Sequence, residues 1–252
     1  PDTKTKILLS VAIQYQQMEL FSKSLELLDD LEKLSSQIDN EIQKHSLLGK
    51  ANAVRGMIYK SQSNPDLALN KFLIAVKHLQ QILPQDKSEA NLSVVFYNIG
   101  YCYVEIGKST DAKTAFNQSL KFAKQSKAIS LEVFAYKGVS DVYFNEGQHQ
   151  QSLDLLNLAE QIAKNVGDLL LDEGIYKGKT DNFLALNMFD EYQVYNDNYL
   201  KTRFVREQNE LKSIHNSIDN QMKVSELKLN DIKNKHQKIN LLIVSLALII
   251  CV

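Results

Sequence analysis

A short motif in this chain returns after an interval of forty residues. The residues Tyr-Lys-Gly-Val-Ser-Asp at 136–141 are answered by Tyr-Lys-Gly-Lys-Thr-Asp at 176–181, and Gly107 is answered by Gly147. Self-similarity at a period of about 20–50 residues indicates one supersecondary unit stacked on copies of itself. Because a single unit cannot bury its apolar side chains alone, neighbouring units share a core and leave an extended surface for partners.

The composition favours helices and argues against nucleic acid as a partner. Only nine Gly and three Pro occur in 252 residues, too few for the many tight turns of an all-β protein. The 44% of apolar residues is ordinary for a packed core, and a net charge of −1 is unsuited to nucleic acid. We therefore expect an all-α protein that does not contact nucleic acid.

The clearest repeat unit runs from about residue 91 to residue 124. One face of its first predicted helix carries Phe96, Ile99, Gly100 and Tyr103. Gly107 ends this helix, and Ser109 or Thr110 is predicted to cap a second one. The inner face of the second helix carries Ala112, Phe116 and Ser119.

Weaker copies of this unit precede and follow it in phase. The copy forty residues later comprises Tyr136, Val139, Ser140, Tyr143, Gly147, Ser152, Leu156 and Ala159. The upstream copy comprises Gly56, Tyr59, Ala68, Phe72 and Ala75. Between its helices, Asn64 is predicted as an N-cap and Pro65 as the first helical residue. The terminal copies are degenerate, as expected for units that cap the stack against water.

This order of large, small and aromatic residues resembles the tetratricopeptide repeat (TPR), a helix–turn–helix unit of about 34 residues. The resemblance covers about residues 5–200, or about five helix pairs, and implies a TPR-like right-handed superhelix. The spacings of 40 and 44 residues imply longer helices or loops than the consensus, and the consensus Trp is absent because the chain contains no Trp. A generic helical bundle is the alternative.

The chain continues after the repeats as one predicted helix. No Gly or Pro occurs from residue 190 to residue 252, so no helix stop is present. Its seam positions alternate at spacings of three and four, as in a coiled coil, with one extra step of four between Ile218 and Met222. Glu207, Ser225 and His236 interrupt the apolar residues of this seam. The seam residues of this stem are Phe204, Leu211, Ile214, Ile218, Met222, Leu229 and Ile232. We expect a homodimer through the stem, or else a single helix that packs on the repeats.

The last residues, 239–252, are uncharged and almost entirely apolar. They follow a basic stem: residues 200–238 carry nine Lys or Arg and five Asp or Glu, whereas residues 1–199 carry 20 and 25. Fourteen helical residues span about 21 Å, less than the roughly 30 Å of a bilayer core, and a stretch this short is usually a buried core helix or an interfacial segment. Because it ends the chain directly after the basic residues Lys228, Lys233, Lys235 and Lys238, we interpret it as the first part of a transmembrane helix. The predicted domains are TPR-like repeats at 1–200, a stem at 201–238 and a membrane segment at 239–252.

No catalytic, cofactor or metal site is recognisable in the sequence. The five His residues are scattered, and no two share a spacing that would place them together on a helix as metal ligands. Cys102 and Cys251 lie in unrelated contexts, and no Gly-rich phosphate loop, Cys-x-x-Cys pair or nucleophile elbow occurs. We therefore expect a non-catalytic protein that needs neither a cofactor nor a metal.

The candidate binding residues lie on the first helices of the repeats. Lys137 and Lys177 each precede an aspartate by one turn, Asp141 and Asp181, and these pairs are either helix-surface ion pairs or part of a concave groove. Some members of the family hold a partner's terminal carboxylate with a Lys and an Asn at this spacing, but an Asp would repel it. Under the resemblance, four aromatic residues face the same groove or pack between repeats: Tyr97, Tyr101, Phe134 and Phe144. An aromatic lining suits an extended or helical peptide.

Repeats followed by a long helix and a membrane segment resemble the sensor region of bacterial membrane-anchored signalling proteins, in which a histidine kinase module or a helix-turn-helix regulator is also present. The resemblance implies a protein- or peptide-binding region, as in a two-component system, whose stem relays binding to a domain beyond the span. It also implies a periplasmic or extracytoplasmic repeat domain, although the basic flank of the stem leaves the cytoplasmic side open. The alternative is a static adaptor that its C-terminal helix anchors to a membrane.

Overall fold

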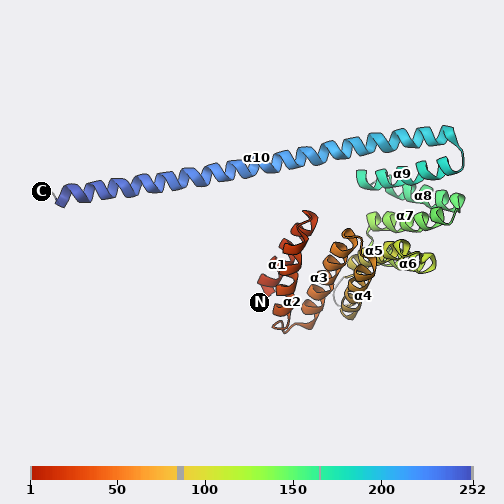
Figure 1. Ribbon diagram of the computed structural model, residues 1–252, viewed down its shortest axis with the longest axis horizontal. Helices are drawn as coiled ribbons and strands as arrows, with labels where there is room; N and C mark the ends of the chain where they lie inside the picture. Colours follow the sequence, from red (N-terminus) through yellow and green to blue (C-terminus); the bar gives the residue numbers. More distant parts are fainter. Residues whose placement is uncertain (1, 84–87, 165, 251–252) are drawn as a thin grey trace. The chain divides into compact units, whose positions relative to one another are not determined.

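The computed structural model describes residues 2–83, 88–164 and 166–250, and in these residues it contains ten helices and no strand (Figure 1). The helices are α1 (Asp2–Gln17), α2 (Phe21–Ser35), α3 (Glu41–Ser61), α4 (Pro65–Gln81), α5 (Glu89–Glu105), α6 (Ser109–Ser126), α7 (Ile129–Asn145), α8 (His149–Ala163), α9 (Leu169–Ala185) and α10 (Phe189–Ile250). This content confirms the all-α prediction. The chain divides into two compact units, residues 1–200 and residues 201–252.

Within residues 1–200 the helices form a repeating stack. Each helix from α1 to α8 contacts the next one along the chain, and each odd-numbered helix also contacts the next odd-numbered helix, from α1 to α9. In the described part of the chain the even-numbered helices α2, α4, α6 and α8 make no such contact with one another. The odd-numbered helices therefore form one continuous row, which we call the odd-helix row.

Turns of one type join the two helices of each pair. In every such turn one residue has a positive φ, between 54° and 76°: Glu19, Ser63, Gly107, Gly147 and Asn187. These residues are 44, 44, 40 and 40 positions apart, which is the period of the repeat domain. After Gly107, for example, the N–H of Lys108 donates to the carbonyl oxygen of Tyr103 at 2.8 Å, the bond by which a left-handed residue closes a helix.

The starts of the second helices show one confirmed and one wrong expectation. Asn64 caps α4, because its side-chain oxygen accepts a bond from the Leu67 N–H at 3.2 Å, and Pro65 occupies the first helical position. Neither Ser109 nor Thr110 caps α6, whose N-cap residue is Lys108 and has no side-chain cap bond. The turn leads so directly into α6 that both hydroxyl residues already lie in its first helical turn.

Phe116 on α6 holds three helices together. Its ring is fully buried. A Cβ atom at Gly100 of α5 would lie 2.5 Å from this ring, and one at Gly138 of α7 would lie 2.4 Å from it. Two residues without side chains therefore make room for one aromatic ring at the point where the helices meet. The same contact occurs one repeat earlier, where Phe72 of α4 fills the space that Gly56 of α3 leaves.

The first turns of α10 complete the repeat domain. The ring of Tyr195 lies 5.3 Å from that of Phe183 and 6.1 Å from that of Tyr176, both on α9. Lys179 of α9, only 1% exposed, forms an ion pair with Glu160 of α8 and donates to the Tyr195 hydroxyl at 3.2 Å. The start of α10 is thus the second helix of a fifth pair, in agreement with the predicted number of pairs.

The expectation of a membrane span is wrong. In the described part of the chain, no helix contains a stretch that is both long enough and apolar enough to cross a bilayer. Extending the apolar run that begins at residue 239 towards the N-terminus brings in Lys238, Lys235 and Lys233. This finding overturns the interpretation of residues 239–252 as a transmembrane segment and the expected membrane anchoring. Residues 251–252, and the side chains of residues 239–250, lie outside the described ones.

Candidate functional site

Two positions one turn apart recur every forty residues on the odd-helix row. They hold Tyr97 and Tyr101 on α5, Lys137 and Asp141 on α7, and Lys177 and Asp181 on α9. Because the period of the turns is also 40 here, these pairs occupy equivalent places in successive repeats. The six residues therefore belong to one row of the domain, and the contacts below decide which of them act together.

The carboxylate of Asp141 joins α5 to α7. Its Oδ2 accepts a hydrogen bond from the Tyr101 hydroxyl at 2.7 Å and another from the Lys137 ammonium group at 2.7 Å. Burial, and then the negative charge of Asp141, hold the pKa of Tyr101 well above its ordinary value, so this hydroxyl stays protonated and donates. The side chains of Lys137 and Asp141 are 24% and 26% exposed, and their charges offset each other.

An aromatic cluster of Tyr97, Tyr101, Phe116 and Phe134 lies between α5, α6 and α7. The Tyr97 ring meets the other three at centroid distances of 4.9 Å for Tyr101, 5.9 Å for Phe116 and 5.6 Å for Phe134. Burial raises the pKa of Tyr97. A cavity of about 160 Å³ lies beside Tyr97 and Phe134. These contacts favour packing between the repeats as the role of the rings, and the half-buried Tyr97 and Phe134 also border the cavity.

Lys60 on α3 extends this cluster and was missed by sequence reasoning. Its ammonium group lies 4.9 Å from the centroid of the Tyr101 ring and donates to the side-chain oxygen of Asn98 at 3.1 Å. Burial lowers the pKa of Lys60. The period could not reveal it, since the residue 44 positions later is Val104. A cation over an aromatic face is a contact between helices that only the fold brings about.

Phe144 and the Lys177–Asp181 pair stand apart from the aromatic cluster. The Phe144 ring packs against His149 of α8, with centroids 5.2 Å apart. The ammonium group of Lys177 lies 2.5 Å and 2.6 Å from the two carboxylate oxygens of Asp181. Their side chains are 48% and 36% exposed, so this pair adds little stability but remains accessible to a partner.

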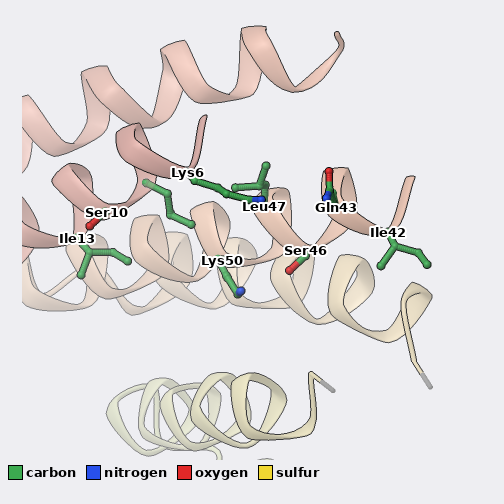
Figure 2. Close-up of a pocket in the computed structure, with 9 residues that line it drawn as sticks. Lys6, Ser10, Ile13, Ile42, Gln43, Ser46, Leu47 and Lys50 are labelled. Atoms are coloured by element: carbon green, nitrogen blue, oxygen red, sulfur yellow. The ribbon is translucent and has the colours of Figure 1, made fainter. Parts of the chain in front are cut away.

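A groove between α1 and α3 lies at the N-terminal end of the odd-helix row (Figure 2). Its cavity has a volume of about 570 Å³. The residues that line it are Lys6, Leu9, Ser10, Ile13, Ile42, Gln43, Ser46, Leu47 and Lys50. Leu9 and Leu47 are buried, and Ile42 is 40% exposed. Sequence reasoning missed this groove because the first helix pair, α1 and α2, is a degenerate copy of the repeat unit.

The described residues form neither a cluster of metal ligands nor a reactive thiol. No group of three or more His, Cys, Asp and Glu side chains in them could hold a metal ion. Cys102 is buried, and burial raises its pKa to about 11, so its thiol stays protonated and unreactive at neutral pH. Two histidines do meet: the Nδ1 atoms of His45 on α3 and His78 on α4 are 2.8 Å apart.

The seam residues of α10 are exposed in the unit formed by residues 201–252. The exposed fractions of their side chains lie between 51% and 62% for Phe204, Leu211, Ile214, Ile218, Met222, Leu229 and Ile232. The charged side chains nearby pair along the helix, with Arg203 to Glu207 at 2.7 Å and Arg206 to Glu210 at 2.6 Å. Together these side chains form an exposed apolar stripe along α10.

Comparisons with known proteins agree with this geometry. A family model described as "Tetratricopeptide repeat" matches residues 94–126, whereas no curated protein sequence matches the chain. BtubC (BKLC) from P. vanneervenii has a similar fold, with 14% identity, a TM-score of 0.66 and coverage of 79% of this chain and 80% of the other. The putative kinesin light chain TPR-like repeats of Podosopora anserina have 12% identity and a TM-score of 0.58, with coverage of 81% of this chain and 96% of the other.

A Rap protein complexed with Competence and Sporulation Factor gives 14% identity and a TM-score of 0.63, with coverage of 83% of this chain and 56% of the other. This chain thus spans a little over half of that protein. At such low identities the solved structures show the fold alone, which is an all-α helical repeat of the tetratricopeptide type. Neither they nor the family model indicates a catalytic family.

Proposed function

We propose that this chain, with its tetratricopeptide-type repeat fold, is a non-catalytic module that binds a protein or peptide on the odd-helix row. The observation that carries the proposal is the unbroken row from α1 to α9. Charged and aromatic side chains recur on this row at the repeat period, and a groove lies at its N-terminal end. A continuous face of this kind suits an extended or helical peptide. The Rap protein bound to Competence and Sporulation Factor offers a precedent for a ligand on a similar fold.

Peptide selection followed by footprinting tests this proposal. A random library of short displayed peptides would be selected against the whole chain, and hydrogen exchange would then be measured with and without the enriched peptides. We expect added protection on α1, α3, α5, α7 and α9, and little on the outer sides of α2, α4 and α6. Protection confined to the even-numbered helices, or the absence of any enriched peptide, would contradict the proposal.

The exposed seam of α10 favours a second role, self-association through the stem. Seven large apolar side chains at coiled-coil spacing are each more than half exposed, and a second copy of the same helix would bury them. Sedimentation of the full chain should then show a dimer. Ile218→Asp with Leu229→Asp should dissociate it, whereas the control Asn216→Asp with Asn220→Asp adds the same charge on the opposite side and should not. A monomeric parent chain would refute this role.

A relay role for the stem rests on the two proposals above. The seam has one irregular step, between Ile218 and Met222. A coiled coil unwinds locally at such a step and can switch there between two ways of packing its helices. Deleting residues 219–222 removes this extra step of four and restores the regular alternation. We expect the deletion to leave repeat unfolding unchanged but to abolish any effect of a bound peptide on dimer dissociation. An unchanged effect in the deletion variant would rule out the relay.

A further inference from the structure

The cavity of about 160 Å³ beside Tyr97 and Phe134, which we call the α5–α7 cavity, lies between two neighbouring helices of the odd-helix row. The residues that line it are Ser93, Val94, Tyr97 and Asn98 of α5, Ser119 of α6, and Leu131 and Phe134 of α7. Ser93 and Ser119 are each 1% exposed and lie at its buried end. Val94 is 37% exposed and lies at its open end, so the cavity is accessible from the row on which the partner is proposed to bind.

The polar side chains that line the α5–α7 cavity already have hydrogen-bond partners. The Ser93 hydroxyl donates to the carbonyl oxygen of Ser119 at 2.9 Å, and the Ser119 hydroxyl donates to that of Ser93 at 2.8 Å. The Asn98 side chain donates to the carbonyl oxygen of Val94 at 2.9 Å and accepts a bond from Lys60 at 3.1 Å. A polar group of a ligand would have to compete with these bonds or stay unpaired, and an unpaired buried group is costly. The cavity therefore selects an apolar group.

The volume of the cavity and the rings beside it suit one further aromatic ring. Tyr97 and Phe134 are arranged edge to face, with their centroids 5.6 Å apart and an angle of 61° between their planes. The Tyr97 hydroxyl is hydrogen-bonded to Tyr101, so this polar atom is also paired. A third ring can extend edge-to-face packing of this kind. Apolar cavities of about 150 Å³ stay dry and bind a molecule of the size of benzene.

We propose that the α5–α7 cavity binds the side chain of one phenylalanine of a partner peptide. The inference rests on the proposed peptide-binding function and names the residue that the peptide must carry. A tyrosine would bring a hydroxyl group to Ser93 and Ser119, whose own hydroxyls are already paired, and an alanine would leave the cavity empty. Tyr97 and Phe134 thus pack the repeats together and also contact the ligand.

Benzene tests the cavity without any peptide. It would be titrated into the whole chain carrying ¹³C-labelled Val and Leu methyl groups, and it should shift the methyl resonances of Leu131. Val94→Trp places a large side chain at the open end and should abolish this shift. The control Leu158→Trp changes a residue of nearly the same exposure on α8, 38% against 37%, and should preserve it. A Leu131 shift that is absent from the parent chain, or that survives in Val94→Trp, would overturn the inference.

The peptides from the selection test the occupant by fluorescence anisotropy. They should share one phenylalanine, and replacing it by Ala or Tyr should weaken binding about tenfold or more. Val94→Trp should weaken binding to a similar extent, and Leu158→Trp should change it by less than about twofold. Circular dichroism would confirm that both variants fold.

Phe134→Ala enlarges the cavity and distinguishes a ligand contact from damage to the fold. A peptide with Trp in place of its phenylalanine should bind this variant better than it binds the parent, a gain that a misfolded variant would not produce. Peptides that tolerate Ala at the phenylalanine, or that bind Val94→Trp as well as the parent, would overturn this inference and leave the proposed function standing. If no peptide is enriched, both are overturned.

Discussion

Residues 1–200 and residues 201–252 contain similar large apolar side chains, but the first unit buries them and the second leaves them exposed. In the first unit Phe72 and Phe116 are buried against glycines of neighbouring helices. In the second unit Phe204 is 62% exposed, and the seam that continues from it is exposed throughout. The comparison teaches that the repeats bury such side chains within the same chain, whereas the stem leaves them exposed, where the proposed second copy of α10 would cover them.

The largest expected effect contrasts one phenylalanine from each unit. Phe116→Ala removes a ring that fills the space between Gly100 and Gly138, and we expect a loss of about 3–5 kcal/mol in the free energy of unfolding. Phe204→Ala removes a ring that is solvent-exposed in the single chain, and in the monomeric Ile218→Asp, Leu229→Asp background it should change that free energy by less than about 0.5 kcal/mol. Urea unfolding followed by far-UV circular dichroism measures both. Equal losses would mean that the stem is also part of a packed core.

A second contrast sets a buried ion pair against an exposed one. Glu160→Gln leaves the Lys179 ammonium group without its counter-charge inside the protein. We expect a loss of about 2 kcal/mol, below the roughly 3–5 kcal/mol for a fully enclosed pair, because Glu160 reaches solvent. Glu207→Gln, which breaks the surface pair with Arg203, should leave the unfolding curve unchanged.

Lys179→Met with Glu160→Leu serves as the check on this second contrast. Replacing both charges by apolar side chains should restore the stability that Glu160→Gln removes, since no unpaired charge remains. A double variant as unstable as Glu160→Gln would show that the hydrogen bond to Tyr195, and not the charge pair, stabilises the start of α10.

The turns should give a smaller effect that is confined to the repeats. Ser63 adopts a φ of +54° that favours glycine, so Ser63→Gly should stabilise the domain by about 0.5–1 kcal/mol. Gly107→Ala is the reverse change at the equivalent turn and should destabilise it by about 1 kcal/mol, although no atom lies within 4 Å of the added methyl group. Thermal unfolding measures both shifts. A destabilising effect of Ser63→Gly, or a stabilising effect of Gly107→Ala, would disprove a common turn conformation.

The sequence predicted the repeats well because their signals are local. Gly107 and Gly147 mark two turns, the Asn64–Pro65 pair marks a helix start, and the lack of Gly and Pro after residue 190 predicts the long helix α10. The left-handed conformation of Glu19, Ser63 and Asn187 was not predicted, since the identity of these residues gives no sign of it. With them the 44- and 40-residue period becomes continuous.

The candidate site was less predictable because its contacts join residues far apart in the chain. Tyr101 and Asp141 are 40 residues apart, and their hydrogen bond depends on how α5 packs on α7. Lys60 reaches the Tyr101 ring from α3, and no spacing rule connects the two residues. The predicted membrane segment was wrong for a different reason, since Lys233, Lys235 and Lys238 precede the apolar residues and no described helix contains a stretch that is apolar enough over the length of a span.

The smallest expected effect is a pH dependence that belongs to the repeats and not to the stem. Burial, then the charge of His45 and of Lys77, lower the pKa of His78, while Glu32 opposes them. The unfolded chain therefore binds more protons than the folded one between the lowered value and the ordinary 6.5, and stability is lost as pH falls through that window. Melting curves from about pH 7.5 to about pH 5.5 should show a falling midpoint.

His78→Gln should flatten this slope. His215→Gln, which alters an exposed residue of the stem, should leave it intact. A slope that persists without His78 would assign the titration to another group.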